Sequence, residues 1–210
     1  MWPNCRLLLF TRYPEPGKTK TRLIPELGAE GAALLQKRLT ERVVLQGHLL
    51  AQRTGIQTTV YYSGGSIARM TAWLGSLDYI AQADGDLGQR MHTAFVDTFA
   101  GTTATAVLIG SDIPDITAAL LQQAFFSLLT RQVVIGPSRD GGYYLVGLHG
   151  HLAERLLPLL FAGMQWSTGD LFTETTRRLK KNGYSWATLP TLRDIDVPVD
   201  LPLAEKRGLL

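Results

Sequence analysis

The chain has 210 residues, of which 45% are hydrophobic and 19% charged, and its net charge is +3. This composition is ordinary for a globular protein with a real core, and so small a net charge does not indicate the dense basic surface of a nucleic-acid-binding protein. Cys5 is the only cysteine, which excludes an intramolecular disulfide and a zinc-binding cysteine cluster. The apolar runs are too short for a signal peptide or a membrane span, so we expect a cytoplasmic protein.

Apolar runs suited to strands alternate with segments of helical periodicity along the whole chain. In chain order we expect a strand at Cys5–Thr11, a helix from Gly31 to about Gln52, a strand at Ile56–Tyr62, a helix at Ile67–Leu74, a strand at Leu77–Ala81, a helix at Gly88–Phe99, a strand at Ala104–Ile109, a helix with Leu121, Ala124, Phe125 and Leu128 on its inner face, strands at Val133–Ile135 and Tyr143–Leu148, helices near 151–160 and 169–181, and a last strand at about 185–189.

This alternation predicts an α/β fold in which helices cover both faces of a mostly parallel sheet. The gap between the strands at Val133–Ile135 and Tyr143–Leu148 is too short for a crossover helix, so we expect one antiparallel excursion. Because the sequence shows no linker, repeat or break in composition, we expect a single domain over residues 1–210. In such sheets ligands bind beyond the carboxyl ends of the strands, so residues that follow strands are candidates for a site.

The first predicted strand leads into a basic loop, PEPGKTKTRL, at residues 14–23. The tripeptide Gly17–Thr19 matches the end of a P-loop, but Arg12 stands where that motif needs its first glycine, and Pro25 stands where its helix should run. A P-loop is therefore a poor interpretation. The segment 12–22 still concentrates four cations, which are Arg12, Lys18, Lys20 and Arg22. They indicate either a phosphate-binding loop or a solvated basic loop.

Three further polar loops follow predicted strands: GSDIPD at 110–115, GPSRDGG at 136–142 and DIDVPVD at 194–200. Asp112 comes directly after a buried strand, where its carboxylate could bind Mg²⁺ or Mn²⁺ together with a second carboxylate and substrate phosphates. The second carboxylate could come from the segment Asp194–Asp200, although Asp194 and Asp196 also suit a polar turn. We expect Asp115 to cap the following helix instead of taking part in a site.

Two glycine-containing loops leave a structural and a functional interpretation open. Asp140 could accept hydrogen bonds from sugar hydroxyls, and Gly141 and Gly142 would let the backbone approach a ligand, but a plain hairpin turn fits equally well. In DGDLGQRM, at residues 84–91, backbone donors could meet a base or a phosphate. On local grounds a turn that starts a helix is the better interpretation there.

Six sequence blocks in order resemble a known family, over about residues 5–203. These blocks are PEPGKTKTRL, DGDLGQRM, GSDIP, GPSRDGGYYLVGL, MQWSTGDLF and DIDVPVDL. They look like the DUF2064 family of GT-A-type nucleotide-diphospho-sugar transferases, whose members are often labelled selenodomain-associated transferases. The chain is more distantly similar to phospholactate and molybdenum-cofactor guanylyltransferases. The resemblance implies a Rossmann-like GT-A three-layer sandwich and a first loop that grips nucleotide phosphates.

The resemblance also implies roles for particular residues. Those implied to bind nucleotide or phosphate are Arg12, Gly17, Lys18, Lys20, Arg22, Asp86, Gly88, Arg90 and Ser111. Those implied on the substrate or acceptor side are Asp140, Gly141, Gly142, Trp166, Ser167 and Thr168. Asp112 and Asp196 would hold Mg²⁺ or Mn²⁺, and the catalytic roles would fall to Lys18, Arg22, Asp112 and Asp140.

The loop at Asp112 departs from the glycosyltransferase pattern, because Asp112-Ile113-Pro114 replaces the Asp-x-Asp motif and lacks its second aspartate. Nucleotidyltransferases of this fold carry such an Asp-x-Pro, with a second metal ligand near the C-terminus. We expect a metal-dependent transferase that moves a sugar from a nucleotide-diphospho-sugar to an unidentified small-molecule acceptor. The alternatives are a nucleotidyltransferase that transfers a nucleotide from a nucleoside triphosphate to a phosphorylated small molecule, and a nucleotide-binding module without turnover. No nucleic-acid partner and no membrane span are expected.

Overall fold

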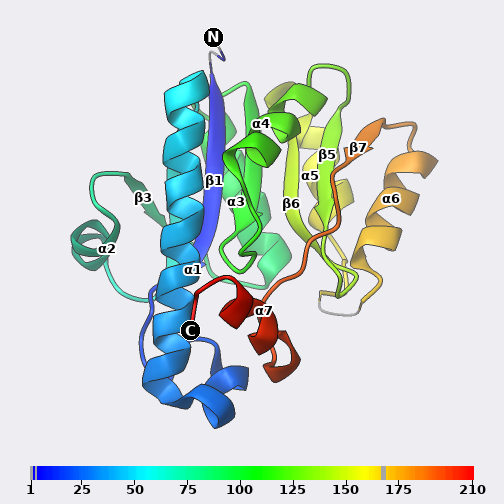
Figure 1. The fold of residues 1–210 in the computed structure, drawn as a ribbon. Helices are drawn as coiled ribbons and strands as arrows, with labels where there is room; N and C mark the ends of the chain where they lie inside the picture. Colours follow the sequence, from blue (N-terminus) through cyan, green and yellow to red (C-terminus); the bar gives the residue numbers. More distant parts are fainter. Residues whose placement is uncertain (1, 3, 167–168) are drawn as a thin grey trace.

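A computed structural model describes residues 2, 4–166 and 169–210. Its strands join in one seven-stranded sheet with the order β3-β2-β1-β4-β6-β5-β7 (Figure 1). The strands are β1 (Cys5–Arg12), β2 (Gln57–Ser63), β3 (Asp78–Ala81), β4 (Thr105–Gly110), β5 (Val133–Pro137), β6 (Tyr143–His149) and β7 (Trp186–Thr188). The expected alternation of strands and helices is confirmed.

The sheet is parallel except at β6, which runs antiparallel to both of its neighbours, β4 and β5. The short connection 138–142 links β5 to β6 as a hairpin, and a parallel pairing would have needed a crossover helix. The expected antiparallel excursion is therefore confirmed. Because β6 starts where its neighbours end, the turn 138–142 lies at the same sheet edge as the carboxyl ends of β1, β4 and β5.

The helices are α1 (Ile24–Thr54), α2 (Ile67–Leu74), α3 (Leu87–Phe99), α4 (Ala118–Ser127), α5 (Ala153–Phe161), α6 (Leu171–Lys181) and α7 (Leu201–Lys206), with 3₁₀ turns at Thr21–Leu23, Gly150–Leu152 and Pro198–Asp200. Helices α1 and α4 pack together on one face of the sheet, while α3, α5 and α6 cover the other. Over the described residues, the helices are all too short or too polar to cross a membrane.

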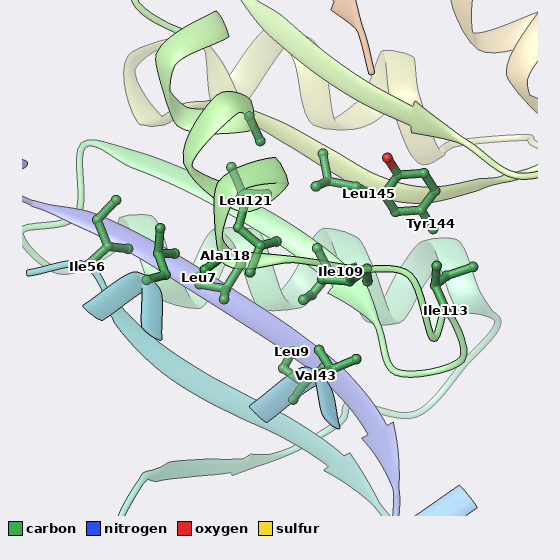
Figure 2. Packing of buried hydrophobic residues seen from close by; sticks show 14 of the residues in the cluster. Leu7, Leu9, Val43, Ile56, Ile109, Ile113, Ala118, Leu121, Tyr144 and Leu145 are labelled. Carbon is green, nitrogen blue, oxygen red and sulfur yellow. The ribbon is translucent and has the colours of Figure 1, made fainter. Parts of the chain in front are cut away.

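Alternation along the central strand fills both cores. Leu7 and Leu9 of β1 point to the face covered by α1 and α4, whereas Leu8 and Phe10 point to the face covered by α3 and α5. Figure 2 shows the first core, in which Leu9 lies beside Val43 of α1. A strand buried on both faces reads as a continuous apolar run, which is why β1 was recognisable in the sequence.

Helix α1 begins earlier than the periodicity indicated, at Ile24, and Gly28 breaks it with a left-handed backbone (φ 68°). Its N-terminal half extends past the sheet edge, beside α7 and the C-terminus (Figure 1). A third apolar cluster joins the two parts: Leu23, Ala32, Leu35 and Leu39 pack against Ile195, Ala204 and Leu209. This cluster brings the segment 194–200 to the basic loop that follows β1.

Candidate functional site

A cavity of about 460 Å³ opens at the carboxyl ends of the parallel strands. It lies across the boundary between β1 and β4, where the chain order of the sheet reverses, which is the usual ligand position in open α/β sheets. Polar side chains from several strand ends line it, including Arg12, Lys20, Ser63, Gln82, Ser111, Asp112, Ser138, Asp140, Asp194 and Asp196. Apolar side chains, including Leu87, Met91, Tyr143 and Trp166, form another part of the wall.

The basic loop is shaped by contacts within itself. Arg12 Nη1 donates to the carbonyl oxygen of Lys18 at 2.9 Å, and Thr19 Oγ1 donates to the carbonyl oxygen of Glu15 at 2.7 Å. Gly17 takes a left-handed backbone (φ 77°), which glycine adopts without a steric penalty. The Lys18 side chain is 71% exposed and pairs with Glu15. Arg12 therefore holds the loop in place, and Gly17 and Lys18 are not among the residues that line the cavity.

Lys20 lies in a different environment from the other cations of the loop. Its side chain is 3% exposed, and its ammonium group donates to the carbonyl oxygen of Ile195 at 2.7 Å. The same nitrogen lies 3.1 Å from Asp112 Oδ1 and 3.2 Å from Asp196 Oδ1. Burial alone lowers the pKa of Lys20, but the two carboxylates outweigh burial and raise it above its ordinary value. Lys20 is therefore held as a cation between the two aspartates.

Backbone contacts fix the separation of these aspartates. The N–H of Ile195 donates to the carbonyl oxygen of Asp112 at 3.1 Å, which ties the segment 194–200 to the loop after β4. The buried Asp200 accepts hydrogen bonds from the N–H groups of Asp196 and Val197, both at 3.0 Å. Burial would raise the pKa of Asp200, but these hydrogen bonds lower it overall. The turn therefore presents the Asp196 side chain from a fixed backbone.

Asp194 lies beside this turn and also lines the cavity. Burial raises the pKa of the Asp194 carboxyl above its ordinary value, and the neighbouring carboxylate of Asp140 adds to the rise. Arg22, whose side chain is 67% exposed, places Nη1 3.0 Å from Asp196 Oδ2. Lys20 and Arg22 thus contact opposite oxygens of one carboxylate. Lys20 has an acceptor for each of its three donors and would have to give up a contact in order to bind phosphate, whereas Arg22 keeps other N–H donors for a ligand.

A buried hydroxyl and amide network supports the loop after β4. Gln36 of α1 donates to Ser111 Oγ and to Thr40 Oγ1, both at 3.1 Å, and Thr11 Oγ1 lies 2.8 Å from Thr40 Oγ1. Ser111 directly precedes Asp112, so the network holds the start of that loop against α1. Sequence reasoning missed Gln36. The sequence does hold a signal for it: Gln36 and Thr40 are four residues apart, so they form a polar pair on the mainly apolar buried face of α1.

The turn between β5 and β6 is closed by Asp140. Its Oδ1 accepts from the N–H of Gly142 at 2.9 Å and from the hydroxyl of Ser138. Gly141 has a left-handed backbone (φ 86°) and lies against the backbone of Gly169 so closely that a β-carbon there would overlap it. Paired glycines therefore do permit a close approach here, but the approaching group is the protein's own chain.

A second cavity of about 360 Å³ adjoins the first. Asp140, Asp194 and Asp196 line both cavities, and the second is otherwise lined by Arg22, Arg139, Arg193, Val197 and Asp200. Arg193 contacts Asp200 at 2.7 Å, whereas the exposed guanidinium of Arg139 has no hydrogen bond or ion pair with any described residue. The three aspartates thus belong to both cavities, whose other polar residues differ.

The loop before α3 makes mainly local contacts. Asp86 caps the helix, accepting from the N–H of Gln89 at 2.8 Å, and Arg90 Nε donates to the carbonyl oxygen of Gly85 at 2.8 Å. Gly88 packs against the indole of Trp166. A β-carbon added to Gly88 would lie only 2.7 Å from Cε2 of that indole, so the contact requires glycine. Asp86, Gly88 and Arg90 thus support a wall of the cavity that Leu87, Met91 and Trp166 form.

Asp115 and the segment 167–168 differ from the other expected residues. The prediction that Asp115 caps α4 is wrong: Thr117 is the cap, accepting from the N–H of Leu120 at 3.2 Å, and Asp115 pairs with Arg207 Nε at 2.6 Å. The helix begins later than the sequence suggested, which frees Asp115 to hold the C-terminal segment. Ser167 and Thr168, which we expected on the acceptor side, lie outside the described residues.

The donor set fits a hard divalent cation that shares its ligands with a substrate. The carboxylates of Asp112 and Asp196 converge on one positive group, the Lys20 ammonium, and their side chains are 43% and 41% exposed toward solvent. Among the described residues, His, Cys, Asp and Glu form no cluster of three or more that could hold a metal ion. A cation bound by this pair would therefore need oxygen ligands from a phosphate or water, as Mg²⁺ commonly does.

The sheet order, the antiparallel β6 and the cavity at the strand ends define a Rossmann-like GT-A fold, the architecture of nucleotide-using transferases. The family model of DUF2064, described as an uncharacterized protein conserved in bacteria, matches residues 46–168. This match spans more than half of the chain, and the chain belongs to this family.

Solved structures support the assignment of the fold. A crystal structure from Desulfovibrio desulfuricans G20, described as a candidate nucleotide-diphospho-sugar transferase, is 29% identical with a TM-score of 0.84, over 98% of this chain and 96% of that one. A CMP:2-keto-3-deoxy-manno-octonic acid synthetase complexed with CTP is 14% identical, with a TM-score of 0.57 over 98% of each chain. The 4-diphosphocytidyl-2C-methyl-D-erythritol synthase from Anaerococcus prevotii DSM 20548 is 10% identical, with a TM-score of 0.63 over 98% and 96% of the two chains. No curated protein matches the chain.

Proposed function

We propose that the protein is a metal-dependent transferase that moves a sugar from a nucleotide-diphospho-sugar to a small-molecule acceptor. The observation that carries this proposal is the convergence of Asp112 and Asp196 on one cationic position, 3.1 and 3.2 Å from Lys20 Nζ, at the boundary of two cavities. A group-transfer enzyme needs a donor and an acceptor on opposite sides of the reacting atom. A module that only senses a nucleotide would need one chamber.

The chain's own residues would supply positioning and charge neutralisation. When bound, Mg²⁺ or Mn²⁺ would neutralise the diphosphate as it leaves. Arg22 is an exposed cation that lines the second cavity, and Lys18 is an exposed cation of the loop whose Arg12, Thr19 and Lys20 line the first. Both would stabilise the same negative charge. Asp140 would accept hydrogen bonds from sugar or acceptor hydroxyls, while Trp166, Leu87 and Met91 provide an apolar wall.

The bond changes in this reaction are simple. The bond between the anomeric carbon and the β-phosphate oxygen breaks, and its electron pair remains on the nucleoside diphosphate. The acceptor oxygen forms the new bond to the anomeric carbon and releases its proton to a nearby base, for which Asp140 is the candidate. No protein nucleophile is required.

Nucleotidyl transfer is the second candidate, because Asp112-Ile113-Pro114 lacks the second aspartate of a glycosyltransferase motif and Asp196 would have to complete the pair instead. An acceptor phosphate would then attack the α-phosphorus, and pyrophosphate would leave with the electron pair of the broken bond. The exposed Arg139 in the second cavity suits a phosphorylated acceptor.

A thermal-shift screen tests these functions. Nucleoside triphosphates and nucleotide-diphospho-sugars are each added with Mg²⁺, Mn²⁺ or a chelator, since a ligand that binds only the folded protein raises Tm. Metal-dependent stabilisation by a sugar nucleotide over its parent triphosphate supports sugar transfer, and the reverse order supports nucleotidyl transfer. Asp112→Asn should abolish the metal-dependent shift, whereas the exposed control Asp97→Asn should retain it. An unchanged shift in Asp112→Asn would refute the assigned metal site.

A further inference from the structure

The Lys20 ammonium occupies a position built for a cation. Its three donors meet three acceptors: the carbonyl oxygen of Ile195 at 2.7 Å, Asp112 Oδ1 at 3.1 Å and Asp196 Oδ1 at 3.2 Å. An ammonium group has three N–H donors, so this set satisfies it completely. Other lysines of the chain differ, because the side chain of Lys37 is 45% exposed although it also pairs with a carboxylate.

The backbone at Lys20 indicates that this placement is specified by the fold. Lys20 has a left-handed conformation (φ 48°, ψ 42°), which is unfavourable for a residue other than glycine. Such strain persists only where the surroundings impose it, and it gathers at functional sites. The left-handed residue directly precedes the 3₁₀ turn Thr21–Leu23, whose Leu23 is anchored in the apolar cluster with Ile195.

Without a cation between them, Asp112 and Asp196 would repel each other. They come from distant parts of the sequence, yet the hydrogen bond from Ile195 to Asp112 holds their loops together. Lys20 supplies the neutralising charge from within the chain. The carboxylates can therefore stay in place when no metal is bound.

We propose that Lys20 is an internal counter-ion that competes with the divalent cation for Asp112 and Asp196. This inference rests on the proposed metal-dependent function. When the metal binds the two carboxylates, the ammonium loses two of its three acceptors and is released toward the cavity that it lines. There it can contact the phosphates of the nucleotide.

This competition predicts cooperation between metal and nucleotide. A metal ion that binds alone must displace Lys20 and leave its charge without a partner, so metal affinity should be weak. A nucleotide phosphate that accepts the released ammonium removes this penalty, and metal and nucleotide then strengthen each other's binding. The lysine thereby makes the site selective for a metal ion that arrives with a phosphate.

The test measures Mn²⁺ binding in the absence of nucleotide, from the electron paramagnetic resonance signal of free Mn²⁺. Lys20→Met removes the competing charge and should bind Mn²⁺ about tenfold more tightly than the wild type, within the usual range of coupling between sites. Mn²⁺ should also raise the Tm of this variant more than that of the wild type. Lys37→Met, which removes an ion-paired lysine of α1 that lines neither cavity, is the matched control and should bind Mn²⁺ as the wild type does.

Two further variants separate the effect of the charge of Lys20 from the effect of its side chain on folding. Lys20→Arg keeps the charge and should keep the weak binding. Lys20→Gln keeps a donor for the Ile195 carbonyl and replaces the methionine variant if circular dichroism shows that the latter is unfolded. Unchanged or weaker Mn²⁺ binding by a folded, uncharged variant overturns the inference. Because no nucleotide is present, this result does not depend on whether the enzyme transfers a sugar or a nucleotide. Absence of any Mn²⁺ binding by the wild type and by every Lys20 variant would instead refute the metal site itself.

Discussion

Gly141 offers a quantitative test of how the turn after β5 closes the cavity. Its backbone is left-handed (φ 86°), and an added β-carbon would overlap the carbonyl group of Gly169. Gly183 has a similar conformation (φ 74°), but an added β-carbon there would have no atom within 4 Å. Comparing Gly141→Ala with Gly183→Ala therefore separates the steric cost from the conformational cost.

The structure sets the expected magnitudes. A left-handed alanine costs about 1–2 kcal/mol, and this is the whole cost expected for Gly183→Ala. Gly141→Ala must in addition displace backbone at Gly169, for which overpacking studies indicate about 1–3 kcal/mol more. For a chain of this length each kcal/mol lowers Tm by about 2–4 °C. We expect losses of about 2–8 °C for Gly183→Ala and about 4–20 °C for Gly141→Ala.

The assay is thermal and urea unfolding of the wild type and both variants, followed by the thermal-shift response to nucleotide with metal. Gly141→Ala should lose more stability than Gly183→Ala and should also lose the nucleotide response, because Gly169 lines the cavity. If Gly141→Ala is no less stable than Gly183→Ala, the close contact between the two glycines does not support this wall, and the reasoning is refuted.

Three other predictions concern the second cavity, the buried network and acid stability. Arg139→Gln should raise the KM for the acceptor without changing that for the nucleotide, and Arg131→Gln, another exposed arginine outside both cavities, should change neither in steady-state kinetics. Gln36→Leu leaves buried hydroxyls without their donor and should cost about 1–3 kcal/mol in urea unfolding; an unchanged midpoint would contradict this role. Hydrogen bonds from Arg177 and Arg178 lower the pKa of Glu174 from 4.5 to about 2. Their contribution to the stability of the fold is therefore present above pH 4.5 and is lost as the pH falls toward 2. Glu174→Gln should therefore lose less Tm than the wild type over that interval, and equal losses would refute the assignment.

Much of the architecture followed from local patterns. The apolar run of β1 and the four-residue spacing of Leu35 and Leu39 both indicate buried side chains. Such patterns can be recognised within one segment, because they depend only on the spacing of apolar residues. The short connection 138–142 excluded a crossover helix and so fixed the direction of β6. Asp112 was a candidate metal ligand because it directly follows a strand, and the residues that follow parallel strands lie at the same edge of the sheet.

The contacts within the site depended on tertiary packing. Nothing local to Lys20 indicates that its ammonium lies between Asp112 and Asp196, because the segment 194–200 reaches it only through the cluster that joins α1 to the C-terminal segment. Gln36 likewise becomes a site residue only because α1 buries it against the ends of β1 and β4. The sequence by itself determined which residues follow the strands, since that is a property of chain order. Only the tertiary structure decided which of them meet, since side-chain partners are selected by packing between segments distant in the chain.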